Sequence, residues 1–250
     1  MQASSIQDPL TRRVAFLKQV PLFAPLTHDQ LRLIAGDFRQ RSYEKGATLF
    51  RQGDRSSDMY VIYEGRVRIF RLSRAGNETS VQLYSVGAVM GELAAIDGLP
   101  RSASAKAIGP CVLLEMEGKQ FANRMRDIPD LAIAMTRLLA GKLRWTTDYA
   151  ETIAQYNAAG RLLHILLSYT NQFGHELEAG RRYELTLNLN QTDLASLVGA
   201  RREWVNRILQ DWHKLGLIEY RAGTIVILDL PRVVQLRDSS LEASQHRTEG

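Results

Sequence analysis

The sequence has very little cysteine, since Cys111 is the only one among its 250 residues. A single thiol excludes a disulfide within the chain and argues against a zinc site or iron–sulfur cluster with cysteine ligands. Because Cys111 stands in the apolar run 111–114, we expect a buried side chain that packs as a small hydrophobic residue. None of the five histidines lies in the patterned segments 91–103 and 128–155, so we expect no haem and no metal.

Long apolar runs are missing as well. The longest stretches, such as 112–114 and 224–228, are far shorter than the roughly 18–20 residues that a transmembrane helix needs. Residues 1–9 are polar and contain no apolar core of a signal peptide. We therefore expect no membrane partner and a cytoplasmic location. A hydrophobic fraction of 45% in 250 residues is enough for two independent cores.

Catalytic motifs are also lacking. The sequence contains no Walker loop, zincin motif, nucleophile elbow or paired-acid constellation, and Gly141-Lys142 has no upstream glycine of a P-loop. We therefore expect that the chain is not an enzyme. What it has in excess is positive charge, with a formal net charge of +5 and a pI of about 9.4. A basic balance permits a polyanionic partner such as nucleic acid.

The first compositional zone, residues 1–127, turns from helical to β-rich. Residues 27–30 have the Thr-x-x-Gln pattern of a helix capping box. From Thr48 onward the segments 59–63, 67–71 and 80–84 are short, β-rich and separated by glycines, which predicts a compact β-barrel or roll. Val67 and Ile69 alternate with arginines at positions 66, 68 and 71, which predicts a strand with one face in water.

The second zone, residues 128–156, predicts a long helix over 128–155. Pro129 stands where a first-turn proline is tolerated. A row at alternating spacings of four and three is typical of a helix–helix seam, which a second copy of the chain could complete. An alternative is that the row packs on the core of its own domain. The row consists of Leu131, Met135, Leu138, Lys142, Trp145, Tyr149 and Thr152.

The third zone, residues 157–236, begins at Asn157, a favourable N-cap that predicts a hinge and a new helix. Further on, Asn190 caps a short helix, Gly199 provides a turn, and a second helix buries Val205, Ile208, Leu209 and Trp212. A β-hairpin over 217–227 follows, with its turn at Arg221-Ala222-Gly223. This order predicts a winged helix-turn-helix. The tail, residues 237–250, is polar, and we expect it to be disordered.

The start of the second helix carries side chains suited to DNA. Arginine can bond guanine O6 and N7 in a bidentate manner, and glutamate can accept from cytosine N4. The alternative is an ordinary solvated charged face. The expected exposed residues are Arg201, Arg202, Glu203, Asn206 and Arg207.

The segment 198–209 resembles the recognition segment of the CRP/FNR regulators, in the pattern of the members that respond to cyclic AMP. The resemblance implies that Arg202, Glu203 and Arg207 read bases in each half-site, and that Gln191 contacts a phosphate. One departure is Arg201, which stands where the family usually has a small hydroxyl cap. Its loss removes about 1 kcal/mol of capping and adds a cation that could contact phosphate.

The segment 91–103 offers backbone amides near Gly91, a short apolar helix and then Arg101-Ser102. An arginine, a hydroxyl and the N–H groups of a helix N-terminus suit a phosphate, and a carboxylate such as Glu92 can accept from a ribose hydroxyl. The alternative is a plain ion pair between Glu92 and Arg101.

The whole segment 91–103 resembles the phosphate-binding cassette of cyclic-nucleotide-binding domains. The resemblance implies that Glu92 binds the ribose 2′-OH, that Arg101 and Ser102 bind the cyclic phosphate, and that Gly91 and Leu93 supply backbone groups or shape. It extends to the long helix, where Thr146-Thr147 falls at an adenine-contacting pair. Lys142 falls at an arginine that reaches toward the nucleotide, but lysine lacks the planar bidentate geometry of arginine.

Together these features predict an α+β chain with an N-terminal jelly-roll-like β-roll, a long dimerisation helix and a C-terminal winged helix-turn-helix. The resemblance implies a homodimeric transcription factor that responds to a cyclic nucleotide, with cAMP as the first candidate. It also implies that the dimer binds a palindromic double-stranded DNA operator and RNA polymerase. The alternatives are a regulator that responds to cGMP, to another ligand or to none. An alternative of another class is a nucleotide-sensing module that controls an enzyme or channel.

Overall fold

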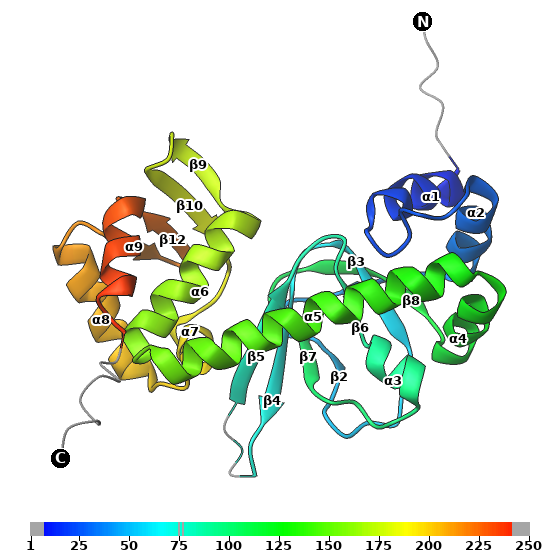
Figure 1. The fold of residues 1–250 in the computed structure, drawn as a ribbon, viewed down its shortest axis with the longest axis horizontal. Coiled ribbons are helices and arrows are strands. Elements are labelled where there is room, and N and C mark those ends of the chain that lie inside the picture. The colour runs from blue at the N-terminus through cyan, green and yellow to red at the C-terminus, as the bar shows by residue number, and fades with distance from the viewer. Residues whose placement is uncertain (1–7, 75, 77, 242–250) are drawn as a thin grey trace, which may run out of the picture. The chain divides into compact units, whose positions relative to one another are not determined.

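The structure is a computed structural model that describes residues 8–74, 76 and 78–241 (Figure 1). The chain forms two compact units, one from residues 1–76 and 81–144 and the other from residues 77–80 and 145–250. Each unit is described by itself below. Within the described ranges, no helix combines the length and the apolarity needed to cross a membrane.

The first unit begins with helices and continues as a strand-rich roll. Its elements are α1 (Pro9–Gln19), α2 (His28–Asp37), β1 (Arg39–Tyr43), β2 (Thr48–Phe50), β3 (Met59–Glu64), β4 (Val67–Leu72), β5 (Glu78–Tyr84), β6 (Val89–Met90), α3 (Glu92–Asp97), β7 (Ser104–Ala107), β8 (Cys111–Met116), α4 (Gly118–Asp127) and the start of α5 (Pro129–Gln155). The capping box predicted at the start of α2 is confirmed, because the Thr27 hydroxyl accepts from the Gln30 N–H and the Gln30 side chain accepts from the Thr27 N–H.

Two antiparallel sheets form the roll, with strand orders β1-β8-β3-β6 and β2-β7-β4-β5. Alternate residues of each strand face the space between the sheets, where an apolar cluster includes Phe50, Tyr60, Ile69 and Leu113. Cys111 belongs to this cluster and is buried, as predicted, and burial raises the pKa of its thiol. The opposite face of the first sheet packs against α1, α2, α4 and the start of α5 in a second apolar cluster. The predicted β-roll is therefore confirmed.

One prediction for this roll is wrong. The arginine at position 68 was expected on a water-facing side of its strand, but Arg68 is only 3% exposed. Its guanidinium lies 4.6 Å from the centre of the Phe70 ring, two residues along the same face of β4. Strand alternation gives the face of a side chain, but the neighbours decide whether that face meets water.

Helix α5 shows which surface its regular row of residues covers. Leu131 and Met135 are buried in the helical core of the first unit, and Leu138 packs against it. Further along, Trp145 stacks on Tyr149. The first part of the row, Leu131 to Leu138, therefore packs on the core of its own domain, as the alternative had it, whereas the seam with a second copy stays a prediction for the rest of the row. Alternation of three and four identifies an apolar stripe but not the partner that covers it.

The second unit contains the end of α5, α6 (Ala158–Phe173), β9 (His175–Glu178), β10 (Arg182–Thr186), α7 (Gln191–Val198), α8 (Arg202–Lys214), β11 (Ile218–Arg221), β12 (Thr224–Ile227) and α9 (Leu230–Asp238). Its strands form one antiparallel sheet in the order β11-β12-β10-β9. Two predicted caps are confirmed. The Asn157 side chain accepts from the N–H groups of Ala159 and Gly160 at the start of α6, and Asn190 and Asp193 form a capping box at the start of α7.

The tail differs from expectation at its beginning. Arg237 and Asp238 belong to the last turn of α9 rather than to a disordered segment. Beyond that helix, the carbonyl of Ser240 accepts from the Asn157 N–H, and Leu241 forms a β-bridge with Tyr156. The chain therefore folds back on the junction between α5 and α6. Residues 242–250, the rest of the predicted tail, lie outside the described residues.

Candidate functional site

The predicted cassette begins with a glycine that no other residue could replace without movement. Gly91 is the N-cap of α3 and has a φ of 78°, in the left-handed region. A Cβ atom at this position would lie 2.7 Å from both the Arg101 guanidinium and the Asp58 carbonyl oxygen. Glycine therefore allows the arginine to approach the backbone at the start of α3.

Arg101 is buried, with 3% of its surface exposed, and the backbone and side chains around it hold its guanidinium in place. It donates to the carbonyl of Gly91 at 2.9 Å, to the carbonyl of Asp58 at 2.7 Å and to the Ser56 hydroxyl at 3.1 Å. Its charged carbon lies 4.3 Å from the centre of the Phe50 ring. Burial lowers the pKa of Arg101, against the opposing effect of nearby groups such as Asp58.

Within the described residues, every hydrogen-bond acceptor of this guanidinium is neutral. No carboxylate among them forms an ion pair with Arg101, so the simple Glu92–Arg101 pair does not form. Asp58, Asp54 and Glu92 act on the guanidinium only from beyond ion-pair distance, so its buried charge is only partly compensated. The position therefore suits an anionic ligand.

Glu92 has a different partner. Its carboxylate is 3% exposed and lies 2.8 Å from the ammonium of Lys142 on α5. The same ammonium donates to the carbonyl of Val89 at 2.9 Å and lies 5.1 Å from the centre of the Tyr84 ring. Burial acts to lower the pKa of Lys142, but the charges and hydrogen bonds of Glu92 and Tyr84 together outweigh it, and the pKa is raised. Lys142 thus joins α5 to the first turn of α3.

The remaining cassette residues lie at the surface. Ser102 is exposed and follows Arg101 directly, so its hydroxyl is open to solvent. Leu93 is 45% exposed, which fits the prediction that it contributes its backbone or its shape rather than a buried side chain. Thr146 and Thr147 are exposed positions of α5 in the second unit.

The predicted reading helix is α8. Gly199 ends α7 with a φ of 66°, and α8 then buries Val205, Leu209 and Trp212 against its own unit. Ile208, also expected to face inward, is half-buried. The opposite face therefore remains available at the surface.

The side chains of Arg202, Glu203 and Arg207 are all exposed, and in the described part of the chain none of the three has a hydrogen-bond or ion-pair partner. Arg202 and Glu203 occupy the first turn of α8, and Arg207 lies one turn beyond Glu203 on the same side. Arg201 is the N-cap and its side chain makes no capping hydrogen bond, as its chemistry predicts. The arginine side chains and the Glu203 carboxylate can therefore all contact a ligand outside the chain.

Asn206 and Gln191 have a structural partner in each other. The Gln191 amide donates to the Asn206 side-chain oxygen at 2.9 Å, which ties the start of α7 to α8. Both side chains are half-buried. The bond therefore orients the two helices of the motif relative to each other.

The wing is the predicted hairpin. β11 pairs with β12, and Ala222 and Gly223 have φ values of 48° and 88°, the left-handed pair of a tight hairpin turn. A Cβ atom on Gly223 would lie 2.9 Å from Asn188, so a glycine allows the turn to pack on the preceding loop.

Comparisons with known proteins match these two units. Residues 40–127 match the cyclic nucleotide-binding domain family, and residues 160–236 match the Crp-like helix-turn-helix domain family. The cyclic AMP receptor protein of Thermus thermophilus is 30% identical over 211 residues, which cover 84% of this chain and 94% of that protein. The chain belongs to the CRP/FNR family of transcription regulators.

Solved structures show the same fold. FixK2 from Bradyrhizobium japonicum superposes with a TM-score of 0.70 at 21% identity. The superposition covers 80% of this chain and 96% of the FixK2 chain. The c-di-GMP-responsive global regulator CLP of Xanthomonas campestris has a TM-score of 0.69 at 22% identity, covering 81% and 99%. The family consists of transcription regulators and not of enzymes, so the chain is a transcription regulator with a cyclic-nucleotide-binding fold and a helix-turn-helix.

Sequence reasoning missed several residues that surround Arg101. Ser56 and Asp58 hold Arg101, and Phe50 and Tyr60 lie beside it, yet they precede it by more than 40 positions. No local pattern marks them, because polar residues after a glycine turn are typical of any loop. Only the pairing of distant strands brings them to the arginine.

A comparison of two glycines tests the close approach at Gly91. Gly91→Ala and Gly98→Ala both place a side chain at a left-handed φ at an end of α3, which costs about 1–2 kcal/mol. Only Gly91→Ala adds a clash, since nothing lies within 4 Å of a Cβ at Gly98. We expect Gly91→Ala to lower the free energy of unfolding by about 1–3 kcal/mol more than Gly98→Ala, measured by denaturant titration. Equal losses would contradict the described geometry.

Proposed function

We propose that the chain is a homodimeric transcription factor whose affinity for operator DNA is controlled by a cyclic nucleotide bound at the cassette. The first candidate for this nucleotide is cAMP. The observation that carries this proposal is the buried guanidinium of Arg101, which has only neutral acceptors in the described residues. A cyclic phosphate would supply the missing negative charge. The exposed hydroxyl of Ser102 and the N–H groups at the start of α3 would complete its hydrogen bonds.

Glu92 has the chemistry to accept a ribose 2′-OH, but Lys142 already holds it. A nucleotide would therefore share or replace that ion pair, and either change alters the link between α3 and α5. Binding would then shift an existing equilibrium between arrangements of α5. The capped junction at Asn157 is the place where such a shift passes to the DNA-binding half. In this role Thr146 and Thr147, exposed on α5, would contact the base.

The proposed dimer uses a different face of α5 from the row that packs within the chain. A second row of exposed or half-buried residues follows the same alternation of three and four, and Ile133 is 50% exposed and Leu143 68% exposed. Two such stripes from two copies would bury each other as a parallel pair of helices. The row consists of Ile133, Thr136, Ala140, Leu143, Thr147, Ala150 and Ala154.

In the proposed complex, α8 enters the major groove and Arg202, Glu203 and Arg207 contact base edges. Arg201, Gln191 and Asn206 lie beside them, where the first two can contact phosphates and Asn206 positions Gln191. Two copies would bind half-sites about 34 Å apart on a palindrome. A regulator of this design acts in the cytoplasm and works with RNA polymerase.

A second candidate is a regulator of the same design with another effector. The pairing of Glu92 with Lys142 favours it, because the ribose-binding carboxylate is already engaged. The c-di-GMP-responsive regulator CLP of Xanthomonas campestris has the same fold, so this fold accommodates other effectors. Titration with cAMP, cGMP and c-di-GMP separates these effectors. The domain limits that we propose are 1–127 and 128–156, as predicted, with the last domain extended from 157–236 to 157–238 so that it includes all of α9.

Ser102→Ala tests the nucleotide site without disturbing the core, because the serine side chain is exposed. Loss of a hydrogen bond to a charged phosphate, at about 1.5–3 kcal/mol, should weaken cAMP binding by roughly 10–150-fold in calorimetry. Arg101→Ala should weaken it at least as much, with circular dichroism to check the fold. Ser85→Ala is the matched control in the same unit and should leave affinity unchanged. Unchanged affinity in Ser102→Ala and Arg101→Ala would refute the assignment.

Arg207→Ala tests base reading. Loss of a bidentate contact to guanine should cost about 1–3 kcal/mol on the operator and broaden the sequence preference at one position of each half-site. The control is Lys214→Ala, near the end of the same helix, which should leave the preference unchanged. Fluorescence anisotropy with operator and scrambled DNA measures both. Equal weakening on both DNAs by Arg207→Ala would make Arg207 a phosphate contact only.

A further inference from the structure

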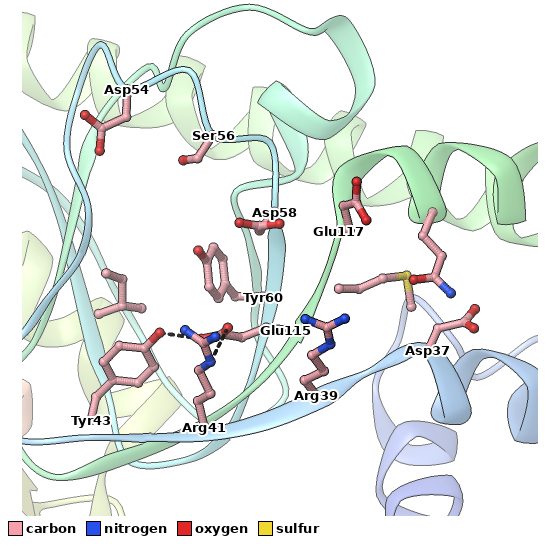
Figure 2. A pocket seen from close by; sticks show the side chains of 13 residues that line it. Asp37, Arg39, Arg41, Tyr43, Asp54, Ser56, Asp58, Tyr60, Glu115 and Glu117 are labelled. Carbon is pink, nitrogen blue, oxygen red and sulfur yellow. Dashed lines mark hydrogen bonds and ion pairs between the residues drawn. The ribbon is translucent and has the colours of Figure 1, made fainter.

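A polar cavity of about 510 Å³ opens in the first unit where β1, β3 and β8 meet the loop before β3 (Figure 2). Its volume is in the range of small-molecule sites. Charged and hydroxyl-bearing side chains line most of it, in contrast to the apolar cluster between the sheets. The polar lining includes Arg39, Arg41, Tyr43, Asp54, Ser56, Asp58, Tyr60, Glu115 and Glu117.

The buried tyrosine of this cavity has an unused polar group. Tyr60 is 5% exposed, and within the described residues its hydroxyl makes no hydrogen bond. Figure 2 shows this hydroxyl directed into the cavity, between the loop of Ser56 and the side chain of Tyr43. Burial raises the pKa of Tyr60 to about 12, so the hydroxyl stays protonated at neutral pH. A hydroxyl without a partner that faces open space, on a ring that is itself buried, is available to a ligand.

The carboxylates around the cavity are not all paired. Glu115 accepts from Tyr43 and pairs with Arg41 at 3.4 Å, and Asp37 pairs with Arg124 at 2.6 Å. By contrast, Asp58 and Glu117 have no cationic partner at ion-pair distance in the described part of the chain.

Asp54 accepts only a backbone N–H, from Arg51. Among the described lining residues, Arg39 is the one cation without an ion pair, and it is exposed at the rim, as Asp54 and Glu117 are. One unpaired positive charge therefore stands against the carboxylates of Asp54, Asp58 and Glu117. The unpaired charge that faces the cavity is therefore mainly negative.

We propose that this cavity is a separate small-molecule site that takes an organic cation with primary ammonium groups. The carboxylates of Asp58 and Glu117 bind the ammonium groups, and the hydroxyl of Tyr60 accepts a hydrogen bond from one of them. The aliphatic part of the ligand lies over the apolar edge that Leu49 and Met116 provide.

The cavity shares a wall with the proposed nucleotide site but does not depend on it. Asp58 and Ser56 line the cavity and also accept hydrogen bonds from Arg101, through the Asp58 carbonyl and the Ser56 hydroxyl. Tyr60 lies beside the same guanidinium, 5.7 Å from its central carbon to the ring centre. A ligand in the cavity that fixes the positions of these residues would therefore act directly on the contacts of Arg101.

Calorimetric titration of the full chain with 1,4-diaminobutane tests the site. We expect saturable binding of one diamine per chain, and none of 1,4-butanediol or succinate, which have the same carbon number without positive charge. Glu117→Gln and Asp58→Asn should each weaken diamine binding about tenfold or more, and Tyr60→Phe by a smaller factor. Glu117 is exposed, so that substitution leaves the fold intact even if Asp58→Asn does not.

Glu44→Gln is the matched control. Glu44 is an exposed carboxylate next to Tyr43 that does not line the cavity, and its substitution should leave diamine affinity unchanged. An equal loss in Glu44→Gln would mean diffuse attraction to a negative surface and would overturn the proposal. It would also be overturned by the absence of saturable diamine binding, by unchanged affinity in Glu117→Gln, or by binding of succinate in place of the diamine.

Discussion

The buried ion pair between Glu92 and Lys142 connects the cassette to the long helix. A carboxylate that is 3% exposed is stable only with a charged or strongly hydrogen-bonding partner, and Lys142 provides it from α5. The same lysine donates to the carbonyl of Val89 at the start of β6, so α3, β6 and α5 meet at one ammonium group. Any ligand that competes for Glu92 therefore acts on the helix that also carries the proposed dimer surface.

Arg101 complements this pair. Its guanidinium is fixed by neutral acceptors on two chain segments, and the absence of a side chain at Gly91 allows it to approach the start of α3. The result is a positive charge that is already positioned and only partly compensated. In the proposed mechanism the phosphate meets an arginine that does not need to be ordered first, which lowers the entropic cost of binding.

Features encoded by a few neighbouring residues were predictable from the sequence. The caps at Thr27, Asn157 and Asn190, the turn at Gly199 and the wing hairpin depend on local chemistry, and the structure contains all of them. The uncapped start of α8 at Arg201 followed from the lack of a short hydroxyl side chain. Local rules of capping and turn formation decide these positions.

Features that depend on distant partners were not predictable. The row from Leu131 to Thr152 was predicted as a seam with a second copy, yet its first part packs on the core of its own domain, because α5 carries more than one regular stripe and the sequence does not say which stripe the core covers. Burial of Arg68 and the contacts of Ser56 and Asp58 with Arg101 likewise depend on how strands pair across the roll. The pairing of Lys142 with Glu92 was not predicted either, because the two residues are 50 positions apart.

The central claim is that occupancy of the cassette controls reading of DNA by α8. Selection of bound sequences from a randomised DNA pool, with and without cAMP, tests it most directly. We expect enrichment of one two-fold symmetric site, with half-sites about one helical turn apart, only when cAMP is present. Enrichment of the same site at the same level without cAMP, or of no site under either condition, would contradict the account.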